Sequence, residues 1–449
     1  MANTPVVPEQ TRVVAEFVAH TSEAEVPVAA VDLARRAMAD TVGVALAGRR
    51  DATGRAMLDY VLDQAARPVA GLLGGGRSTP ELAGLANGLF AHALEFDDIN
   101  HPLYGHPSAS TVPALLAIGE EIDATVGDAL IAYVLGVEVD ALLGSQMMMA
   151  HSERGFHSTG TIGALGATAA AARLAGLDPG LTQHAFGVAA SLAGGLRANF
   201  GTMTKPLHAG TAAMAAVQAV RLAQRGWTAN PEIFTGEIGF ISAHGGTPSG
   251  EPLARLGTHW SLLAPAGLAV KPYPSCGATH TAIDAALAVR RLLGAEEIAH
   301  VRVGVSPRAP HLLIFDSPET GGEARFSAQY TVAAALVRGA IGLDDFSDAA
   351  VSDGAVRALM DRITVVVDER HRASTQYPAS VAVHTRGGRV IEKTVELARG
   401  KNANPLSEEE LEAKFDGCVG PGHTGLWATW RHAPLDMPIA ELVAATAPK

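Results

Sequence analysis

The segment 158–177, STGTIGALGATAAAARLAGL, places glycines at positions 160, 163 and 166 and fills much of the remainder with alanine. Small residues at this spacing form a helix face that another helix backbone can approach closely. The run is only weakly apolar and contains Arg173, which favours a buried helix over a membrane span. The chain is therefore expected to fold around closely packed helices.

Composition supports a globular protein with a large core. Of the 449 residues, 48% are hydrophobic, 18% are charged and only 5% are aromatic, which is typical of packed helices and excludes disorder. The formal net charge of −12 argues against a nucleic-acid surface, although cations gathered in a cleft would still bind a small anion. Two cysteines, Cys276 and Cys418, are too few for a disulfide framework. With no signal peptide evident at the N-terminus, we expect a cytoplasmic protein without nucleic-acid or membrane partners.

Apolar periodicity predicts a mostly α-helical chain with an inserted α+β lid. Residues 1–264 read as the first part of a helical domain, with helices at 9–20, 27–48, 81–96, 110–121, 126–150, 158–176, 180–195 and 207–226. Residues 265–400 add alternating strand patterns at 300–307, 362–370, 380–387 and 389–397, the last two joined by the hairpin signal TRGGRV, and helices at 279–294, 327–338 and 346–360. Residues 401–449 are helical again and are expected to return to the first domain, beginning with a capping box at Ser407 and Glu410.

Familiar cofactor motifs are absent from the sequence. There is no HExxH, CxxC, EF-hand loop or GxSxG, and GLLGGGRSTP (71–80) lacks the GK[ST] ending of a phosphate-binding loop. We expect 71–80 to be a plain turn. No metal or organic cofactor is predicted.

Polar and titratable residues gather instead in four short segments between the apolar helices. These are 94–110 with Glu95, Asp97, Asp98, His101, Tyr104 and His106; 151–160 with Arg154 and His157; 196–210 with Arg197, Lys205 and His208; and 271–280 with Lys271, Tyr273 and His280. Gln329 and Tyr330 begin a helix of the lid. At a helix N-terminus, His157 and the residues after it would offer backbone donors to a carboxylate.

Each of these residues also has a purely structural interpretation. A single histidine in a loop is more often a hydrogen-bonding residue than a catalyst, and Asp98 is expected to cap or to bind loop amides. Lysines beside prolines are often solvated, Arg154 would suit a surface ion pair, and Cys276 is expected to be a packed thiol. The recurrence of His or Lys beside Gly and Pro in four segments favours a shared site.

Such a set of groups suits a small polycarboxylate substrate. Lysine and arginine hold carboxylates, and a histidine can take or give a proton at the carbon alpha to a carboxylate. Loss of water, loss of CO2 and racemisation at that carbon all need this equipment, and spacing alone does not separate them.

The segments HALEFDD, GHPSAS, GFHSTGTIGA, TKPLHAG, KPYPSCGATHTAIDA and AQYTVAAAL occur in one order over roughly residues 30–415. In them the chain resembles the MmgE/PrpD family, which includes 2-methylcitrate dehydratase, cis-aconitate decarboxylase and iminodisuccinate epimerase. The resemblance implies a helical domain built from both chain ends, an α+β lid, a homodimer, and an active site between the domains without metal or organic cofactor.

The resemblance also implies which residues act. The catalytic group would be Glu95, His106, His157, Lys205, His280 and Tyr330, and the substrate-binding group would be Asp97, Arg154, Lys271 and Tyr273. Glu95 departs from the family pattern, since relatives of the decarboxylase branch usually have Asp there. The extra methylene moves the carboxylate by about 1.5 Å, which would alter the substrate accepted.

The first expectation for function is a cofactor-independent lyase, most simply a 2-methylcitrate-type dehydratase. In it, His106 or His157 moves the proton, Lys205 and His280 bind carboxylates, and Tyr330 completes the pocket from the lid. An epimerase of an amino-dicarboxylate such as iminodisuccinate is the main alternative. A cis-aconitate-type decarboxylase and a non-catalytic polycarboxylate-binding protein remain open as well.

Overall fold

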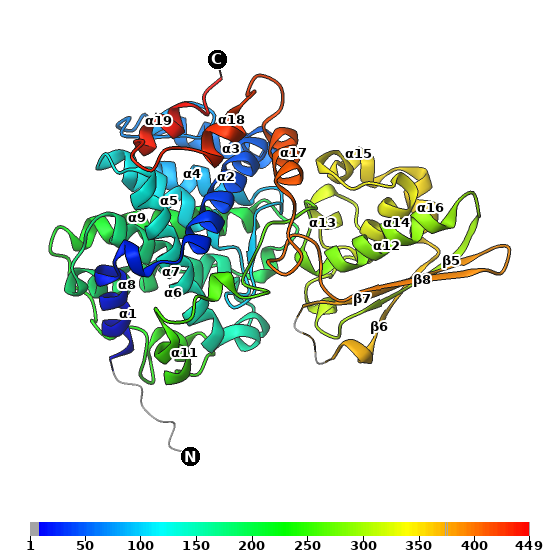
Figure 1. Cartoon of the computed structure of the whole chain (residues 1–449), viewed down its shortest axis with the longest axis horizontal. Coiled ribbons are helices and arrows are strands. Elements are labelled where there is room, and N and C mark those ends of the chain that lie inside the picture. The colour runs from blue at the N-terminus through cyan, green and yellow to red at the C-terminus, as the bar shows by residue number, and fades with distance from the viewer. Residues whose placement is uncertain (1–8, 373, 375, 449) are drawn as a thin grey trace.

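The protein forms two cores, one large and helical and one small and mixed. The computed structural model describes residues 9–372, 374 and 376–448. Figure 1 shows the helical domain on one side and the α+β domain, with its sheet, on the other. The predicted fold class, a large helical domain with a smaller α+β domain, is confirmed.

Helices from both ends of the chain build the larger domain. They are α1 (Gln10–His20), α2 (Val28–Arg50), α3 (Ala52–Asp63), α4 (Pro80–His92), α5 (Pro107–Glu121), α6 (Val126–Glu153), α7 (Ser158–Leu174), α8 (Pro179–Leu192), α9 (Thr204–Ala223), α10 (Phe240–Ala243), α11 (Gly250–Arg255), α17 (Glu408–Val419), α18 (Leu426–Arg431) and α19 (Ile439–Ala444). The C-terminal helices pack beside α2 and α5, as Figure 1 shows in red against blue. The capping box predicted at the start of α17 is present. Among the helices of the described part of the chain, none is long and apolar enough to cross a membrane.

The three glycines of α7 each allow a different neighbouring segment to approach the helix closely. A Cβ at Gly160 would lie 2.3 Å from the carbonyl oxygen of Gly194, and one at Gly166 would lie 2.2 Å from the Asp140 side chain of α6. Gly163 faces Ser110 of α5 at 3.0 Å. Three residues turn an α-helix by less than a full circle, so the glycines drift around α7 and admit a different element at each step.

The smaller domain is a four-stranded sheet covered on one face by helices. Its strands β5 (Ile298–Val305), β6 (Ile363–Val367), β7 (Ala379–Thr385) and β8 (Val390–Val395) lie in the order β6-β5-β7-β8, with β6 parallel to β5 and the others antiparallel. Helices α12 (His280–Leu293), α14 (Ala328–Arg338) and α16 (Gly354–Met360) cover one face (Figure 1). The predicted hairpin is confirmed as β7–β8.

The chain passes between the two cores twice. It leaves the larger core after Val270 and enters the smaller one at Tyr273; it returns to the larger core at Leu406. Segment 71–80 was predicted to be a plain turn, but the turn covers only residues 72–76, between the short antiparallel strands β1 (Ala70–Gly71) and β2 (Arg77–Ser78), and the segment ends in the first residue of α4.

The loop between α4 and α5 is buried and tightly anchored. Helix α4 ends at His92, before the predicted end at 96, and α5 begins at Pro107. The Asp98 carboxylate accepts hydrogen bonds from the backbone amide and hydroxyl of Ser108, as expected of a capping residue, and from the Tyr133 hydroxyl at 3.5 Å. Strand β3 (Ile99–Asn100) pairs with β4 (Leu268–Ala269), which ties the loop to the crossing between the cores.

Close helix packing makes one glycine a sharp test of this core. A Cβ on Gly210 of α9 would lie 2.3 Å from the Leu85 carbonyl oxygen of α4. We expect Gly210→Ala to lower the free energy of unfolding by ~1–3 kcal/mol because α4 and α9 must move apart. The control is Gly417→Ala, at an exposed position of α17 where a Cβ meets nothing. There the higher helix propensity of alanine should raise the free energy of unfolding by up to ~1 kcal/mol. Equal changes in chemical denaturation would contradict the packing.

The Asp98 anchor predicts a pH dependence of stability. Burial raises the pKa of this carboxyl to about 7, whereas in the unfolded chain it is about 3.9. Between these values the folded state holds a proton that the unfolded state has lost, so this group's contribution to the unfolding free energy falls as pH rises from 4 to 7 and is level above 7. Asp98→Asn removes that fall. The unfolding free energy of Asp98→Asn minus that of the wild type should therefore rise as pH increases from 4 to 7. Curves that stay parallel over this window would contradict the prediction, and exposed Asp361→Asn is the control.

Candidate functional site

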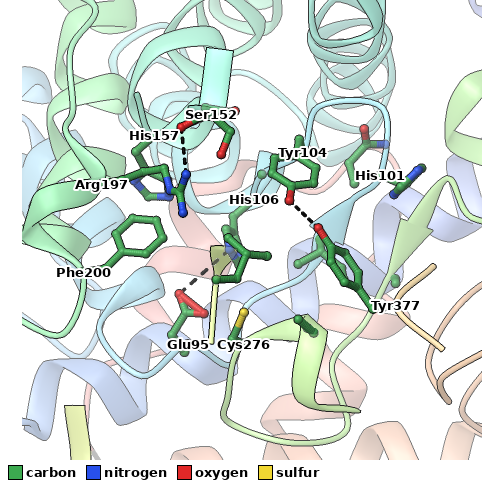
Figure 2. A pocket seen from close by; sticks show the side chains of 18 of the residues that line it. Glu95, His101, Tyr104, His106, Ser152, His157, Arg197, Phe200, Cys276 and Tyr377 are labelled. Atoms are coloured by element: carbon green, nitrogen blue, oxygen red, sulfur yellow. Dashed lines mark hydrogen bonds and ion pairs between the residues drawn. The ribbon is translucent and has the colours of Figure 1, made fainter. Parts of the chain in front are cut away.

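A cavity of about 110 Å³ lies where the helical domain meets the α+β domain. Figure 2 shows its side chains converging from both domains. Apolar walls come from Ile99, Phe156, Phe200, Leu312 and Phe326. Its polar lining residues are Glu95, Asn100, His101, Tyr104, His106, Ser152, His157, Ser158, Arg197, Lys205, Cys276, Tyr377 and Lys401.

Three helices begin at this cavity. His106 is the residue that precedes α5, His157 precedes α7, and Lys205 is the second residue of α9. Helix N-termini carry unpaired amides and partial positive charge, which favours anions. Loops that end in such helices thus bring side chains from distant parts of the sequence to one positive region.

Glu95 is held between two buried lysines. Its carboxylate pairs with the Lys205 ammonium and, at 3.1 Å, with the Lys271 ammonium, which also donates to the Glu95 backbone oxygen at 2.9 Å. Glu95 has φ of 54°, a left-handed conformation that is strained for a residue with a side chain. One carboxylate between two ammonium groups leaves an excess of positive charge.

The lysine charges are destabilised by this environment. Burial lowers the pKa of Lys205, and the charges of Lys271 and Arg325 lower it further. Burial likewise lowers the pKa of Lys271. The contact with Glu95 opposes both shifts, and a substrate carboxylate would do the same.

Asp97 links two imidazoles. Its Oδ2 lies 2.8 Å from Nδ1 of His92 and 3.3 Å from Nδ1 of His106. Nδ1 of His106 also lies 2.8 Å from the Asp98 carbonyl oxygen, so it donates, and Nε2 faces the cavity 3.9 Å from a Glu95 carboxylate oxygen (Figure 2). Burial alone would raise the pKa of Asp97, but the two imidazoles hold it well below its usual range.

His92, Asp97 and His106 are also close enough to be metal ligands, with their ligand atoms within 4.8 Å of one another. However, the Lys205 ammonium lies 3.0 Å from Nε2 of His92. A second cation there would be repelled, and Nδ1 of His106 already bonds the Asp98 carbonyl. The donor set suits a hydrogen-bonded Asp–His pair better than a metal centre.

His157 is held in its neutral form. Burial lowers its pKa well below the usual value, and His92, His208 and His106 lower it further. Its Nδ1 lies 3.0 Å from Nδ1 of His208, and its ring stands edge-on to Phe200 at 5.0 Å between centroids. In this neutral form His157 can accept or relay a proton.

The structure brings four of the predicted catalytic residues together: Glu95, His106, His157 and Lys205 line one cavity. Of the predicted substrate-binding residues, Lys271 and Asp97 contact these side chains from behind without lining the cavity themselves.

The remaining predicted residues lie outside the cavity lining. Nε2 of His280 lies 3.2 Å from the Ser275 carbonyl oxygen, and burial lowers its pKa to about 3. The Tyr273 hydroxyl donates to Asp284 at 2.7 Å, and the Tyr330 hydroxyl donates to the Asp345 carbonyl. Arg154 is exposed and covers Gly245. The polar atoms named here are occupied by neighbours, so this structure does not place these side chains against a substrate.

Two cations line the cavity that the sequence did not assign to the site. Arg197 donates to the carbonyl oxygens of Ser152, at 2.8 Å, and His311, while its Nε is shielded and without a partner in the described structure (Figure 2). Lys401 donates to Gln376, and burial lowers its pKa to about 8. Arg197 stands in one of the four polar segments, but no motif marks Lys401.

A tyrosine pair also closes one side of the cavity. The hydroxyls of Tyr104 and Tyr377 are hydrogen-bonded, which joins the α4–α5 loop to the smaller domain (Figure 2). Burial raises the pKa of Tyr104. Tyr377 follows no periodic pattern, so only the fold identifies it.

The sequence matches two family models over most of its length. The MmgE/PrpD N-terminal domain matches residues 12–252, and the MmgE/PrpD C-terminal domain matches residues 273–424. Among curated proteins, a cis-aconitate decarboxylase from Mus musculus is 33% identical over 353 residues, covering 76% of this chain and 72% of the relative. A cis-aconitate decarboxylase from Homo sapiens is 30% identical over 351 residues, covering 76% and 72%. A cis-aconitate decarboxylase-like protein oryM from Aspergillus oryzae is 29% identical over 374 residues, covering 76% and 75%. The chain therefore belongs to the MmgE/PrpD family.

Proposed function

We propose that the protein is a lyase that removes CO2 from a small unsaturated polycarboxylate, of which cis-aconitate is the model. The sequence alone put a dehydratase first. The three relatives named above are decarboxylases or decarboxylase-like, and they favour the decarboxylase alternative instead.

The excess of positive charge at the cavity carries this proposal. Lys205 and Lys271 share one carboxylate, and the walls add Arg197 and Lys401, neither of which forms an ion pair with an acid in the described structure. Three helix N-termini add partial positive charge. A ligand with two or three carboxylates would neutralise these groups, whereas a neutral or monoanionic ligand would leave several unpaired.

The same geometry suits decarboxylation. When the C–C bond to CO2 breaks, its electron pair forms a new C=C bond, the electron pair of the original C=C bond moves to the carbon alpha to a second carboxylate, and that carbon takes up one proton. Nε2 of His106 faces the cavity and delivers this proton from the imidazolium form, in which both ring nitrogens carry a proton, while Asp97 beside Nδ1 stabilises the imidazolium charge that is lost on transfer. The lysines would stabilise the negative charge that develops on the retained carboxylate.

His106 is the first residue to test. We expect His106→Asn to lower kcat by ~10²–10⁴-fold, because it removes the proton donor while leaving the fold intact. Release of CO2 from cis-aconitate and proton NMR of the product measure the effect. Exposed His259→Asn is the matched control and should retain the wild-type rate. A His106→Asn enzyme within about threefold of wild type would remove His106 from the mechanism.

The same product assay separates the alternative reactions. A dehydratase would interconvert an alkene and a hydroxy acid without releasing CO2. An epimerase would exchange substrate hydrogen for solvent deuterium without either change. Either result, with no CO2 released from cis-aconitate, would replace the decarboxylase proposal.

Arg197 is expected to bind substrate without taking part in proton transfer. Its shielded Nε lacks a partner, so a substrate carboxylate would complete its bonding. We expect Arg197→Gln to raise KM by ~10–100-fold with a smaller change in kcat. Steady-state kinetics test this, with exposed Arg225→Gln as the control and thermal midpoints to verify folding. A fall in kcat at constant KM would instead place Arg197 in the chemical step.

A further inference from the structure

A second cavity, of about 420 Å³, lies beyond Glu95 and Lys205. It shares Glu95, Lys205 and Phe326 with the catalytic cavity. Its other walls come from residues 51–53 at the start of α3, residues 201–206 before and in α9, and two segments of the smaller domain around α13 (Gly321–Ala324) and α15 (Asp348–Val351). The proposed decarboxylation makes no use of this space.

Arg325 gives the second cavity its chemical character. Its backbone is bonded, with the carbonyl accepting from the Cys276 amide at 2.9 Å, but its guanidinium forms no hydrogen bond or ion pair with any described residue. Its Nε is shielded from solvent, and burial lowers its pKa to about 10. The guanidinium carbon lies 5.6 Å from the centroid of the Phe346 ring, a contact that leaves the hydrogen-bond donors of the guanidinium unpaired and points to an anionic partner that the protein itself does not supply.

The acids in the same walls do not fill that role. Asp51 accepts a hydrogen bond from the Thr53 amide at 2.9 Å, and Asp348 accepts one from the Gly321 amide at 2.8 Å. Neither acid forms an ion pair with Arg325 within the described structure, although the charges of both raise its pKa. Both acids are therefore engaged at helix starts, and the two terminal nitrogens of the guanidinium remain available to a ligand.

The positive charge of Arg325 extends to the catalytic lysines. It lowers the pKa of Lys205 and of Lys271, after the larger effect of burial on each. Lys205 and Lys271 both contact Glu95, and Arg325 lines the same second cavity as Glu95 and Lys205. An anion in the second cavity would relieve this repulsion from the side opposite the catalytic cavity.

We propose that the second cavity is a separate binding site for a small dicarboxylate, held by Arg325 at one end and facing Lys205 at the other. A guanidinium binds a carboxylate through two parallel hydrogen bonds, and the cavity has room for a four-carbon diacid. Hydroxyl groups of Thr53, Thr202 and Ser347 stand in the walls as further polar partners. Because Lys205 faces both cavities, an occupant of this site competes with Glu95 for its ammonium and is coupled to the catalytic site.

Calorimetric titration with succinate tests the proposal without turnover, since succinate has no double bond to react. We expect two binding events per chain in the wild-type protein. Arg325→Gln should retain one event and weaken the other by at least ~10-fold, because the paired charged hydrogen bonds are lost. Exposed Arg302→Gln, in the same domain, should retain both.

A second variant guards against misfolding of the first. Ala52 is an exposed residue of the cavity wall, and Ala52→Phe fills the space without removing a charge. It should abolish the same event as Arg325→Gln. One event or none in the wild-type protein, or two undiminished events in Arg325→Gln or Ala52→Phe, would overturn the proposal. Because binding alone is measured, the outcome stands whether or not cis-aconitate is decarboxylated.

Discussion

The contact of Glu95 with Lys205 and Lys271 is the interaction on which the rest of the site depends. It joins the loop after α4, the start of α9 and the crossing into the smaller domain, three segments far apart in the sequence. Removing Glu95 would leave two ammonium groups buried without a carboxylate to compensate them, which costs more than the contact itself contributes. The contact also forms part of the boundary between the two cavities, so it fixes which groups each one can offer to a ligand.

Much of the fold and part of the site follow from sequence patterns. Long apolar segments predicted helices such as α6, of which residues 129–144 are all buried, and the turn signal between two strand patterns predicted the β7–β8 hairpin. His106, His157 and Lys205 converge because each stands where a loop enters a helix, and helix starts face the same cavity. The way in which the helices pack is therefore sufficient to bring these three side chains together.

The misses have a different physical origin. His92 looks like part of an apolar helix, yet its ring reaches Asp97 and Lys205 because α4 ends there and the chain turns back. Lys401 and Tyr377 come from stretches without periodicity, and only the return of the chain between the cores brings them to the cavity. Tyr330 has the family's residue type, but its hydroxyl donates a hydrogen bond to a backbone carbonyl of its own domain. Residue type can be read from the sequence, whereas the partner of each polar atom cannot.

The adjacent carboxyl groups of Asp97 and Asp98 have the same chemistry, but their surroundings shift their pKa values in opposite directions. Imidazoles keep Asp97 ionised, while burial raises the pKa of Asp98 to about 7.

The same dependence of pKa on surroundings applies when a ligand binds. Burial and neighbouring positive charge lower the pKa of Lys205 and His157. A polycarboxylate would add negative charge beside them, so its binding would raise the pKa of both groups. The substrate would thereby increase the capacity of the site to donate a proton, and a ligand without its carboxylates would bind to a site that is less able to act on it.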